Sequence, residues 1–338
     1  MGGRTTVTAG ELVRAQARVL RWFDEHGRRF AWRETRDPYR TMVAEVMLQQ
    51  TQTGRVAPSY QEFLDRFPTL ERLAHAPAMD VIQAWWGLGY NRRAVDLQRA
   101  AQAVAGAGGA FPREASALRR LPGLGEYSSN AIACFAFDAQ VPVVDTNVRR
   151  VLARAAHGKD ADEVPADAVG ATARSWLPQG EAYRWNQALM DVGAMVCRVT
   201  RPLCPACPLR AGCRYRAAGR DKTARPRPRP KGEPFEGSRR QRRGAIVDHL
   251  RRAARKGITI SELTSLMGPD GAQGDRLVEI LLRLEGEGLA ELSPGARRGS
   301  PRGLVRLPRR RTAPASPRAT GIARGRTKPP PAARPRSR

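Results

Sequence analysis

Apolar residues recur at spacings of three and four along most of the first 216 residues. This period places them on one face of an α-helix. Pro and Gly lie between the periodic segments, and no alternating pattern typical of strands occurs there. We therefore expect an all-α N-terminal domain over residues 8–216. Its predicted helices cover 12–23, 42–48, 81–86, 94–104, 128–137, 148–155 and 186–196.

The pattern changes after residue 216. Residues 217–240 alternate Arg and Pro at their centre, which predicts an extended linker. Residues 241–308 predict a second, small domain that resembles a winged-helix module. The composition of 309–338 predicts a disordered basic tail. The module's predicted elements are helices over 245–255, from Ser261, and over 275–287, then strands at 289–292 and 304–307 around a basic loop.

The formal net charge is +27 over 338 residues, and it is unevenly distributed. Residues 217–243 hold ten Lys/Arg against three Asp/Glu, and 309–338 hold ten against none. Such a charge favours a polyanionic partner, nucleic acid before a membrane. The first forty or so residues lack the apolar run of a signal peptide, and no run of about 18 apolar residues occurs. We therefore expect an intracellular protein, cytoplasmic and associated with the nucleoid.

Four of the five cysteines lie in CRVTRPLCPACPLRAGC. In a reducing compartment, four thiolates this close in sequence indicate a metal site. Zinc and a [4Fe–4S] cluster both accept four thiolates. Only Cys204 and Cys207 have the short spacing of structural zinc pairs, so the irregular spacing to Cys197 and Cys213 favours iron–sulfur. Cys134 lies in an apolar helix and is expected in the core.

A lone carboxylate interrupts the apolar helix TMVAEVMLQQTQT. On a helix, Thr41, Glu45, Gln49 and Gln52 share one narrow stripe. Either this stripe faces water, as in most amphipathic helices, or it lines a polar pocket in which Glu45 works.

Two further segments combine turn and capping residues. In LPGLGEYSSNAIACFAF, Gly123 and Gly125 precede a helix whose free N–H groups could bind a phosphate, although an ordinary turn has the same pattern. In VPVVDTNVRRVLAR, Asp145 is a good helix N-cap. Capping does not prevent the same carboxylate from taking part in catalysis.

Leu121 to Gly125, Asp145 and the four cysteines together resemble the helix-hairpin-helix DNA glycosylases, the endonuclease III superfamily. Within it, EVMLQQTQ, GLGYNRRA, VDTNVRRV and NQALMDVGAMVC resemble the MutY-type adenine DNA glycosylases over about residues 10–216. The resemblance implies two α-helical subdomains and an iron–sulfur loop at 197–213 holding a [4Fe–4S] cluster. It also implies a monomer that excises adenine opposite 8-oxoguanine or guanine in double-stranded DNA.

The resemblance further implies roles for single residues. Glu45 would protonate adenine and Asp145 would steady the sugar cation, supported by Tyr127 and Asn147. Lyases of the superfamily carry a lysine where this chain has Tyr127, so a monofunctional glycosylase is expected. Gly123 and Gly125 would bind the DNA backbone. The positions implied around the extruded adenine are Trp32, Arg33, Leu48 and Gln187, and those facing the opposite base are Gln50, Thr51, Leu88 and Tyr90, with Tyr90 as the wedge.

Other interpretations stay open at this stage. A thymine or uracil mismatch glycosylase of the same superfamily can also carry Tyr at the hairpin, and Trp32 and Leu48 could be ordinary core residues. An endonuclease III-like lyase is disfavoured by the missing lysine, and a non-catalytic iron–sulfur regulator by the presence of both carboxylates. The Nudix-like domain that many family members carry is absent from the C-terminal pattern.

Overall fold

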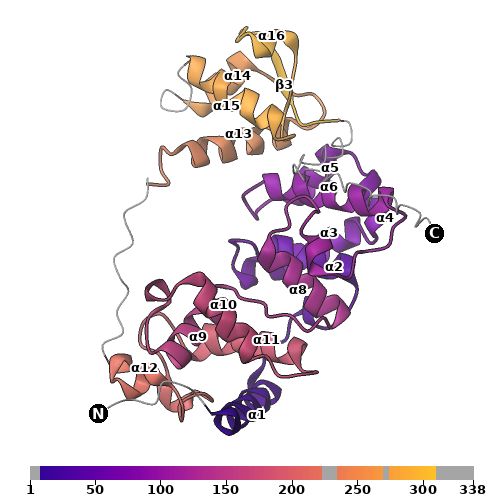
Figure 1. The fold of residues 1–338 in the computed structure, drawn as a ribbon. Coiled ribbons are helices and arrows are strands. Elements are labelled where there is room, and N and C mark those ends of the chain that lie inside the picture. Colours follow the sequence, from indigo (N-terminus) through magenta and orange to yellow (C-terminus); the bar gives the residue numbers. More distant parts are fainter. Residues whose placement is uncertain (1–7, 223–233, 269–273, 310–338) are drawn as a thin grey trace, which may run out of the picture.

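The computed structural model describes residues 8–222, 234–268 and 274–309 (Figure 1). The predicted tail from residue 310 and the centre of the linker, 223–233, lie outside the described residues. The mainly helical fold class is confirmed. The helices up to residue 222 are α1 Ala9–His26, η1 Ala31–Arg33, α2 Pro38–Leu48, α3 Thr53–Arg66, α4 Leu70–His75, α5 Ala78–Ala84, α6 Arg92–Gly106, α7 Ala115–Leu118, α8 Glu126–Phe137, α9 Thr146–His157, η2 Ala161–Glu163, α10 Ala166–Ser175, α11 Ala182–Asp191, η3 Val192–Val196, η4 Cys204–Ala206, α12 Arg214–Ala217 and η5 Arg220–Lys222.

Side-chain caps determine where several of these helices begin. Thr8 and Glu11 form a capping box at the start of α1, and Asp37 caps α2 directly before Pro38. Asp145 caps α9 as its sequence predicts. Two of the predicted helices end differently: α5 ends at Ala84, short of the predicted Trp86, and α11 continues from residue 192 as a π-helix, η3. Helices α3, α4, α7, α10 and α12 lie outside the predicted ranges.

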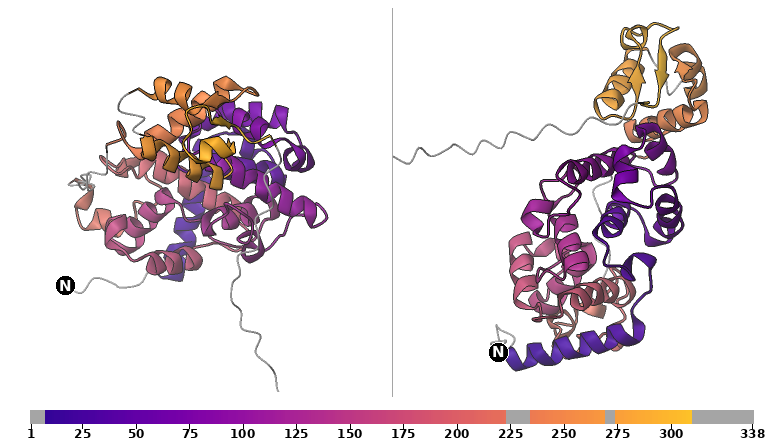
Figure 2. Two further views of the ribbon diagram at one scale, coloured as in Figure 1. Left: turned by 90° about the horizontal axis from the view of Figure 1, so that it is seen from above. Right: turned by 90° about the vertical axis from the view of Figure 1, so that its right-hand side faces the viewer.

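The helices pack around two apolar cores that share α8. One core lies mainly among α2 to α6, and the other lies among α1, α9, α10 and α11. Ile132 and Ala133 of α8 contact the first core, whereas Ala131 and Cys134 contact the second. A helix that is apolar all round is buried on every side, which explains the sequence of α8. The helices that surround the two cores lie next to each other in the right-hand view of Figure 2, and α2 packs on α8.

The C-terminal module contains three long helices and a small antiparallel sheet in the order β1-β3-β2. Ile258 of β1 and Leu292 of β2 both pair with Val305 of β3. Strand β1 and helix α16 are absent from the predicted pattern, and α13 starts before the predicted residue 245. The elements are α13 Arg239–Ala253, β1 Ile258–Thr259, α14 Ile260–Met267, α15 Gly274–Gly286, β2 Glu291–Leu292, α16 Pro294–Arg297 and β3 Leu304–Arg306.

The module packs directly on α5 and α6 at one end of the helical domain (Figures 1 and 2). Met79, Ile82 and Val95 belong to the same buried cluster as the module's Ile246 and Leu250. Among the described helices, none is both long and apolar enough to cross a membrane.

Candidate active site

Glu45 lies in α2, where the helix packs against α8. Glu45 is 4% exposed, and Thr41, one turn earlier on the same face, is 2% exposed. Further along the stripe, Gln49 is half-buried and Gln52 is exposed. The solvent-facing interpretation is therefore wrong for Glu45. Packing of α2 against α8 takes the carboxyl out of water.

Burial raises the pKa of Glu45 to about 7, from an ordinary value of 4.5. The nearby charge of Asp145 contributes to this rise. The hydroxyl of Tyr127, which donates to the Glu45 carboxylate, and the charge of Arg33 oppose the shift. Among the described residues, Oε2 of Glu45 has no hydrogen-bond partner. Glu45 can therefore hold a proton near neutral pH and has one oxygen free to give it.

Asp145 lies at the start of α9 and faces the same region. Its Oδ1 accepts from the Val148 backbone N–H at 2.7 Å, and its Oδ2 accepts from Asn147 Nδ2 at 2.9 Å. Burial raises the pKa of Asp145, but these donors act against that rise because they favour the charged form. Asp145 is thus both a cap and a carboxylate held in a fixed orientation.

The π-helix η3 packs against Asn147, the residue that donates to Asp145. Arg150 donates to Asn147 Oδ1 at 2.8 Å and to the Gly193 carbonyl at 2.7 Å. A Cβ built on Gly193 would lie 2.6 Å from the Asn147 Cβ, so only glycine fits there. Single π-turns of this kind are frequent at functional sites. This series of contacts, from Gly193 to Asn147 and from Asn147 to Asp145, holds the Asp145 carboxylate in place.

Arg33 is held by a carboxylate that the sequence analysis did not select. Asp191 of α11 is fully buried and binds Arg33 Nη1 at 2.8 Å and Nη2 at 3.0 Å. Arg28 binds the same carboxylate at 2.7 Å. Although burial alone would raise it, Arg33 and Arg28 lower the pKa of Asp191 overall. Asp191 interrupts an apolar run, as Glu45 does, and that signal could have identified it.

The remaining residues expected around the extruded base lie at different depths. Trp32 is 8% exposed and stacks on Phe30 with ring centroids 4.7 Å apart, within the first core. Gln187 is buried, and Leu48 is partly buried against the first core. The core interpretation therefore describes Trp32 well in this conformation.

Three of the four residues expected to face the opposite base contact Arg93, which the sequence analysis also missed. Its guanidinium donates to Thr51 Oγ1 at 3.0 Å and to the Leu88 carbonyl at 3.1 Å, and lies 5.5 Å from the Tyr90 ring. Gln50, beside Thr51, has a left-handed backbone with φ of 57°. Burial lowers the pKa of Arg93 to about 10, so it stays charged.

The predicted hairpin joins α7 to α8. Gly123 has φ of 75°, and a Cβ there would lie 2.8 Å from the Asp96 Cβ, so the fold itself requires glycine. Gly125 is the N-cap of α8 and has an extended backbone, and a Cβ there meets no described atom within 4 Å. The fold does not require glycine at Gly125, which leaves its helix end open to a ligand.

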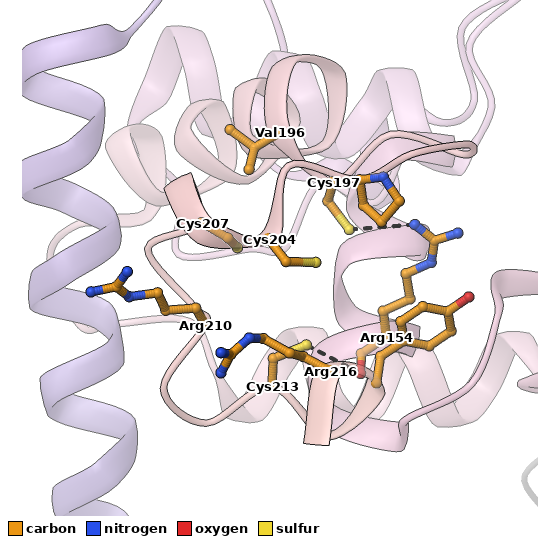
Figure 3. A pocket seen from close by; sticks show the side chains of 10 residues that line it. Arg154, Val196, Cys197, Cys204, Cys207, Arg210, Cys213 and Arg216 are labelled. Carbon is orange, nitrogen blue, oxygen red and sulfur yellow. Dashed lines mark hydrogen bonds between the residues drawn. The ribbon is translucent and has the colours of Figure 1, made fainter. Parts of the chain in front are cut away.

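The four clustered cysteines line one pocket (Figure 3). Cys197, Cys204, Cys207 and Cys213 surround it together with Arg154 and Tyr215. Among the described residues, no group of three or more His, Cys, Asp or Glu is placed to hold a single metal ion. Burial raises the pKa of Cys207 to about 12 and that of Cys204 to about 11. Thiolates here thus need positive charge supplied to the pocket, and this donor set suits a thiolate-bound cluster.

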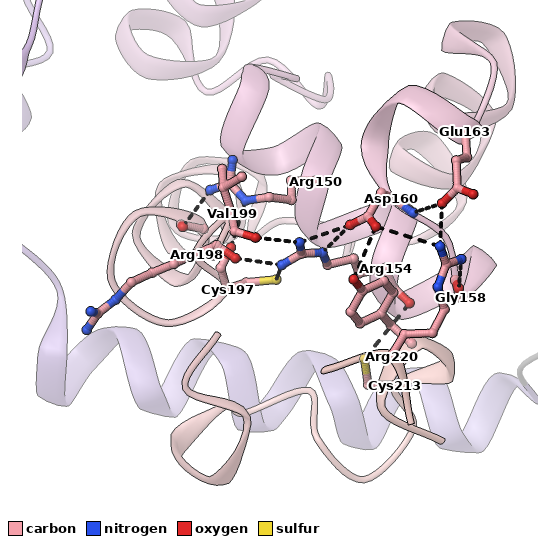
Figure 4. Close-up of polar contacts among 12 residues, drawn as sticks. Arg150, Arg154, Gly158, Asp160, Glu163, Cys197, Arg198, Val199, Cys213 and Arg220 are labelled. Atoms are coloured by element: carbon pink, nitrogen blue, oxygen red, sulfur yellow. Dashed lines mark hydrogen bonds and ion pairs between the residues drawn. The ribbon is translucent and has the colours of Figure 1, made fainter. Parts of the chain in front are cut away.

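Arg154 ties this pocket to α9 (Figure 4). It is 3% exposed and donates to the Arg198 carbonyl at 2.6 Å and to Asp160 at 2.9 Å. It also lies 3.9 Å from the Cys197 sulfur. Arg150, one turn earlier, donates to the Cys197 carbonyl at 2.7 Å. The same helix therefore carries Asp145 at its start and the anchors of the cysteine loop further on.

Comparison with known proteins agrees with this arrangement. Residues 43–177 match the family described as HhH-GPD superfamily base excision DNA repair protein. The chain is 42% identical over 270 residues to the adenine DNA glycosylase of Mycobacterium tuberculosis, covering 78% of this chain and 87% of that protein. It is 38% identical to the human adenine DNA glycosylase over 218 residues, 61% of this chain and 40% of that protein.

The mycobacterial match is longer than the whole N-terminal domain, so similarity extends past the predicted limit of residue 216. Among solved structures, a thermostable thymine-DNA glycosylase is 30% identical with a TM-score of 0.57, covering 60% of this chain and 95% of that one. The fold is shared with an endonuclease III–DNA covalent intermediate, which is 22% identical with a TM-score of 0.55. That match covers 64% of this chain and all of that one. The chain belongs to the adenine DNA glycosylases of the HhH-GPD superfamily of base excision DNA repair proteins.

Proposed function

We propose that this protein extrudes an adenine lying opposite 8-oxoguanine or guanine in duplex DNA and hydrolyses its N-glycosidic bond. The buried, protonatable carboxyl of Glu45 carries the proposal. Adenine is a poor leaving group until a ring nitrogen is protonated, and general acids work best with a pKa near the working pH. A pKa of about 7 and an unpartnered Oε2 meet that need.

The second carboxylate serves the sugar. As the N-glycosidic bond breaks, the deoxyribose becomes oxocarbenium-like, and a nearby negative charge stabilises it. Asp145, held by Val148 and Asn147, supplies that charge in a fixed position. Once Glu45 has given up its proton, it can accept one from the attacking water.

The strand is left intact in this mechanism. A lyase needs an amine that attacks the sugar and forms a Schiff base. Tyr127 occupies the hairpin position instead, and burial raises its pKa well above the ordinary value. It stays a neutral phenol that donates to Glu45 and orients it.

Two groups of residues select the mispair. Trp32, Arg33, Leu48 and Gln187 bind the extruded adenine, with Arg33 oriented by Asp191. Gln50, Thr51, Leu88 and Tyr90 face the opposite base, and the exposed Tyr90 ring enters the stack as the wedge. Gly123 and Gly125 let the phosphate backbone approach the N-terminus of α8. The protein acts as a monomer, in the cytoplasm and associated with nucleoid DNA.

The cysteine pocket holds a [4Fe–4S] cluster through Cys197, Cys204, Cys207 and Cys213. When bound, the cluster supplies iron–thiolate bonds that hold loop 197–213 against α9. The test is the metal content of purified protein. Iron and acid-labile sulfide should be present and lost in Cys204→Ser, but kept in Cys134→Ser, whose thiol lies in the core. Zinc in place of iron would contradict the cluster.

The substrate is tested by single-turnover base release from four duplexes: A opposite 8-oxoguanine, A opposite G, T opposite G and U opposite G. Adenine release, fastest opposite 8-oxoguanine, with strands cut only after added alkali, would support the proposal. The similarity to a solved thymine-DNA glycosylase, at 30% identity, supports a second candidate function, that of a thymine or uracil mismatch glycosylase. Release of thymine or uracil instead would move the chain to that mismatch class, and no release at all would favour a non-catalytic DNA-binding role.

A further inference from the structure

The loop that carries Tyr90 has an unfavourable backbone conformation. Between α5 and α6, Gly87 and Gly89 have φ of 82° and 68°, and Tyr90 has φ of 45°. An aromatic residue in the left-handed region is uncommon and persists only where neighbouring contacts hold it. The loop also exposes two large rings, Trp86 at 71% and Tyr90 at 46%. Something outside the loop must therefore fix it.

One fixing contact comes from within the helical domain. Arg93 donates to the carbonyls of Leu88 and Gly89, both at 3.1 Å. These bonds hold the middle of the loop.

The second contact comes from the C-terminal module. Arg251 of α13 donates through Nε at 3.1 Å and Nη2 at 3.0 Å to the carbonyl of Ile82, near the end of α5. Carbonyls in a last helical turn lack helical partners, and the Trp86 N–H binds Gln83 rather than Ile82. Nη2 of Arg251 also donates to Asn91 Oδ1 at 2.8 Å, at the N-cap of α6. One guanidinium thus joins both ends of the loop.

The module is itself fixed where it makes this contact. Its Ile246 and Leu250 lie in one buried cluster with Met79, Ile82 and Val95. The Met79 backbone N–H donates to the Pro308 carbonyl at 3.0 Å. The Arg251 side chain is only 9% exposed. Apolar packing therefore sets the position of α13, and Arg251 conveys that position to the loop.

We propose that Arg251 is a positioning residue for the Tyr90 loop, and that the C-terminal module thereby helps the enzyme examine the base opposite adenine. The proposal rests on the proposed function, because that function gives the loop its place in the DNA. The role differs from that of a damage-reading domain: the module fixes the loop that enters the stack.

The test uses the full-length chain in a Glu45→Gln background, which is expected to bind DNA and to excise adenine too slowly to interfere. The fluorescent base 2-aminopurine is placed beside the base opposite adenine, where insertion of the loop unstacks it. Arg251→Met should lower the equilibrium constant for the unstacked complex about tenfold, since bonds from a charged donor are lost. Arg252→Met is the control, because Arg252 is the exposed neighbour on the same helix. Equal unstacking in the two variants would overturn the proposal.

A second variant separates positioning from folding of the module. Asn91→Ala removes the bond at 2.8 Å from the helical-domain side and leaves the module's core intact. Asn91→Ala should also lower the equilibrium constant for the unstacked complex. Adding Arg251→Met to Asn91→Ala should lower that constant by a smaller factor than Arg251→Met does in the parent chain. Arg251→Lys should restore part of the signal. Independent, additive effects would contradict a shared role. Adenine release by the unsubstituted enzyme on the same duplex reports separately on the proposed function.

Discussion

Glu45 and Asp145 are both buried carboxyls whose pKa values are raised, yet they accept different numbers of hydrogen bonds. Asp145 accepts from two N–H donors, which favour its charged form. Glu45 receives one donor, from Tyr127, and its Oε2 has no partner among the described residues. Hydrogen-bond donors favour the charged form of a carboxyl, and Asp145 has more of them than Glu45. We therefore expect Glu45 to be the carboxyl that carries the proton.

The raised pKa of Glu45 has a consequence for stability. In the unfolded chain Glu45 loses its proton near pH 4.5, whereas in the folded chain it keeps it to about 7. The free energy of unfolding that Glu45 contributes is therefore greatest below pH 4.5, and it decreases as the pH rises from 4.5 to about 7. Glu45→Gln should gain stability on the order of 3 kcal/mol at about pH 8 and little at about pH 4. Thermal denaturation at both pH values checks this, and an equal shift at the two would refute it.

Asp191 is a fully buried carboxylate, and neutralising it should cost much more stability than neutralising an exposed one. Asp191→Asn leaves Arg28 and Arg33 without their buried partner, and breaking a buried pair costs about 3–5 kcal/mol. The matched change Asp24→Asn removes an exposed partner of Arg184 and should cost under about 1 kcal/mol. Urea denaturation of both variants measures the difference. Similar losses would show that Asp191 does not hold the two arginines as a buried anchor.

Single residues differ in how far sequence reveals them. Glu45 and Asp191 both stand out as carboxylates inside apolar runs. Arg93 and Arg251 do not, because arginine is common throughout this chain and an ordinary arginine faces water. What distinguishes them is the set of carbonyls they reach, and those carbonyls come from other segments.

At the scale of elements, local signals predicted seven helices of the first domain, whereas α3, α4, α7, α10 and α12 were not predicted. Apolar spacing indicates α2, α6 and α8, and the Asp145 cap gives the start of α9. The π-turn of η3 leaves no sequence period, because it forms where Gly193 packs on Asn147. Strand β1 is two residues long and exists through its pairing with β3, about 45 residues further along the chain.

Gly193 tests the link between η3 and the active site. Gly193→Ala would force a Cβ within 2.6 Å of the Asn147 Cβ and so displace Asn147 from Asp145. Single-turnover excision should fall about 10- to 100-fold while DNA affinity changes little. Gly170→Ala is the control, because its Cβ meets only the end of Arg174 at 3.5 Å within α10. A Gly193→Ala enzyme as active as the control would separate η3 from catalysis.

In the whole molecule, the active site lies between the cysteine loop and the C-terminal module. Sequence patterns predict each of these two parts only incompletely. The cysteine loop and α9 lie at one end, and the C-terminal module packs at the other (Figure 1). The module's order of helices and strands is readable from sequence, but its docking is not. Arg251 meets Asn91 across 160 positions, and no local period carries that information.

The charge of the whole chain predicts a salt effect. Residues 310–338 hold nine Lys/Arg and no acidic residue, and each phosphate neutralised adds about 0.9 to the salt slope of B-DNA binding. Deleting 310–338 should flatten the dependence of affinity on salt for undamaged duplex. A tail of equal length with its basic residues changed to Ser should behave like the deletion. An unchanged slope would exclude the tail from DNA binding.

The acid role of Glu45 is tested most directly by the pH dependence of single-turnover adenine release opposite 8-oxoguanine. The rate should fall about tenfold per pH unit above a pKa of about 7 in the parent enzyme and in Glu62→Gln, an exposed control. Glu45→Gln should lose about 10²- to 10⁴-fold and show no such limb. A Glu45→Gln enzyme that keeps both the rate and the pH profile would mean that another group protonates the adenine.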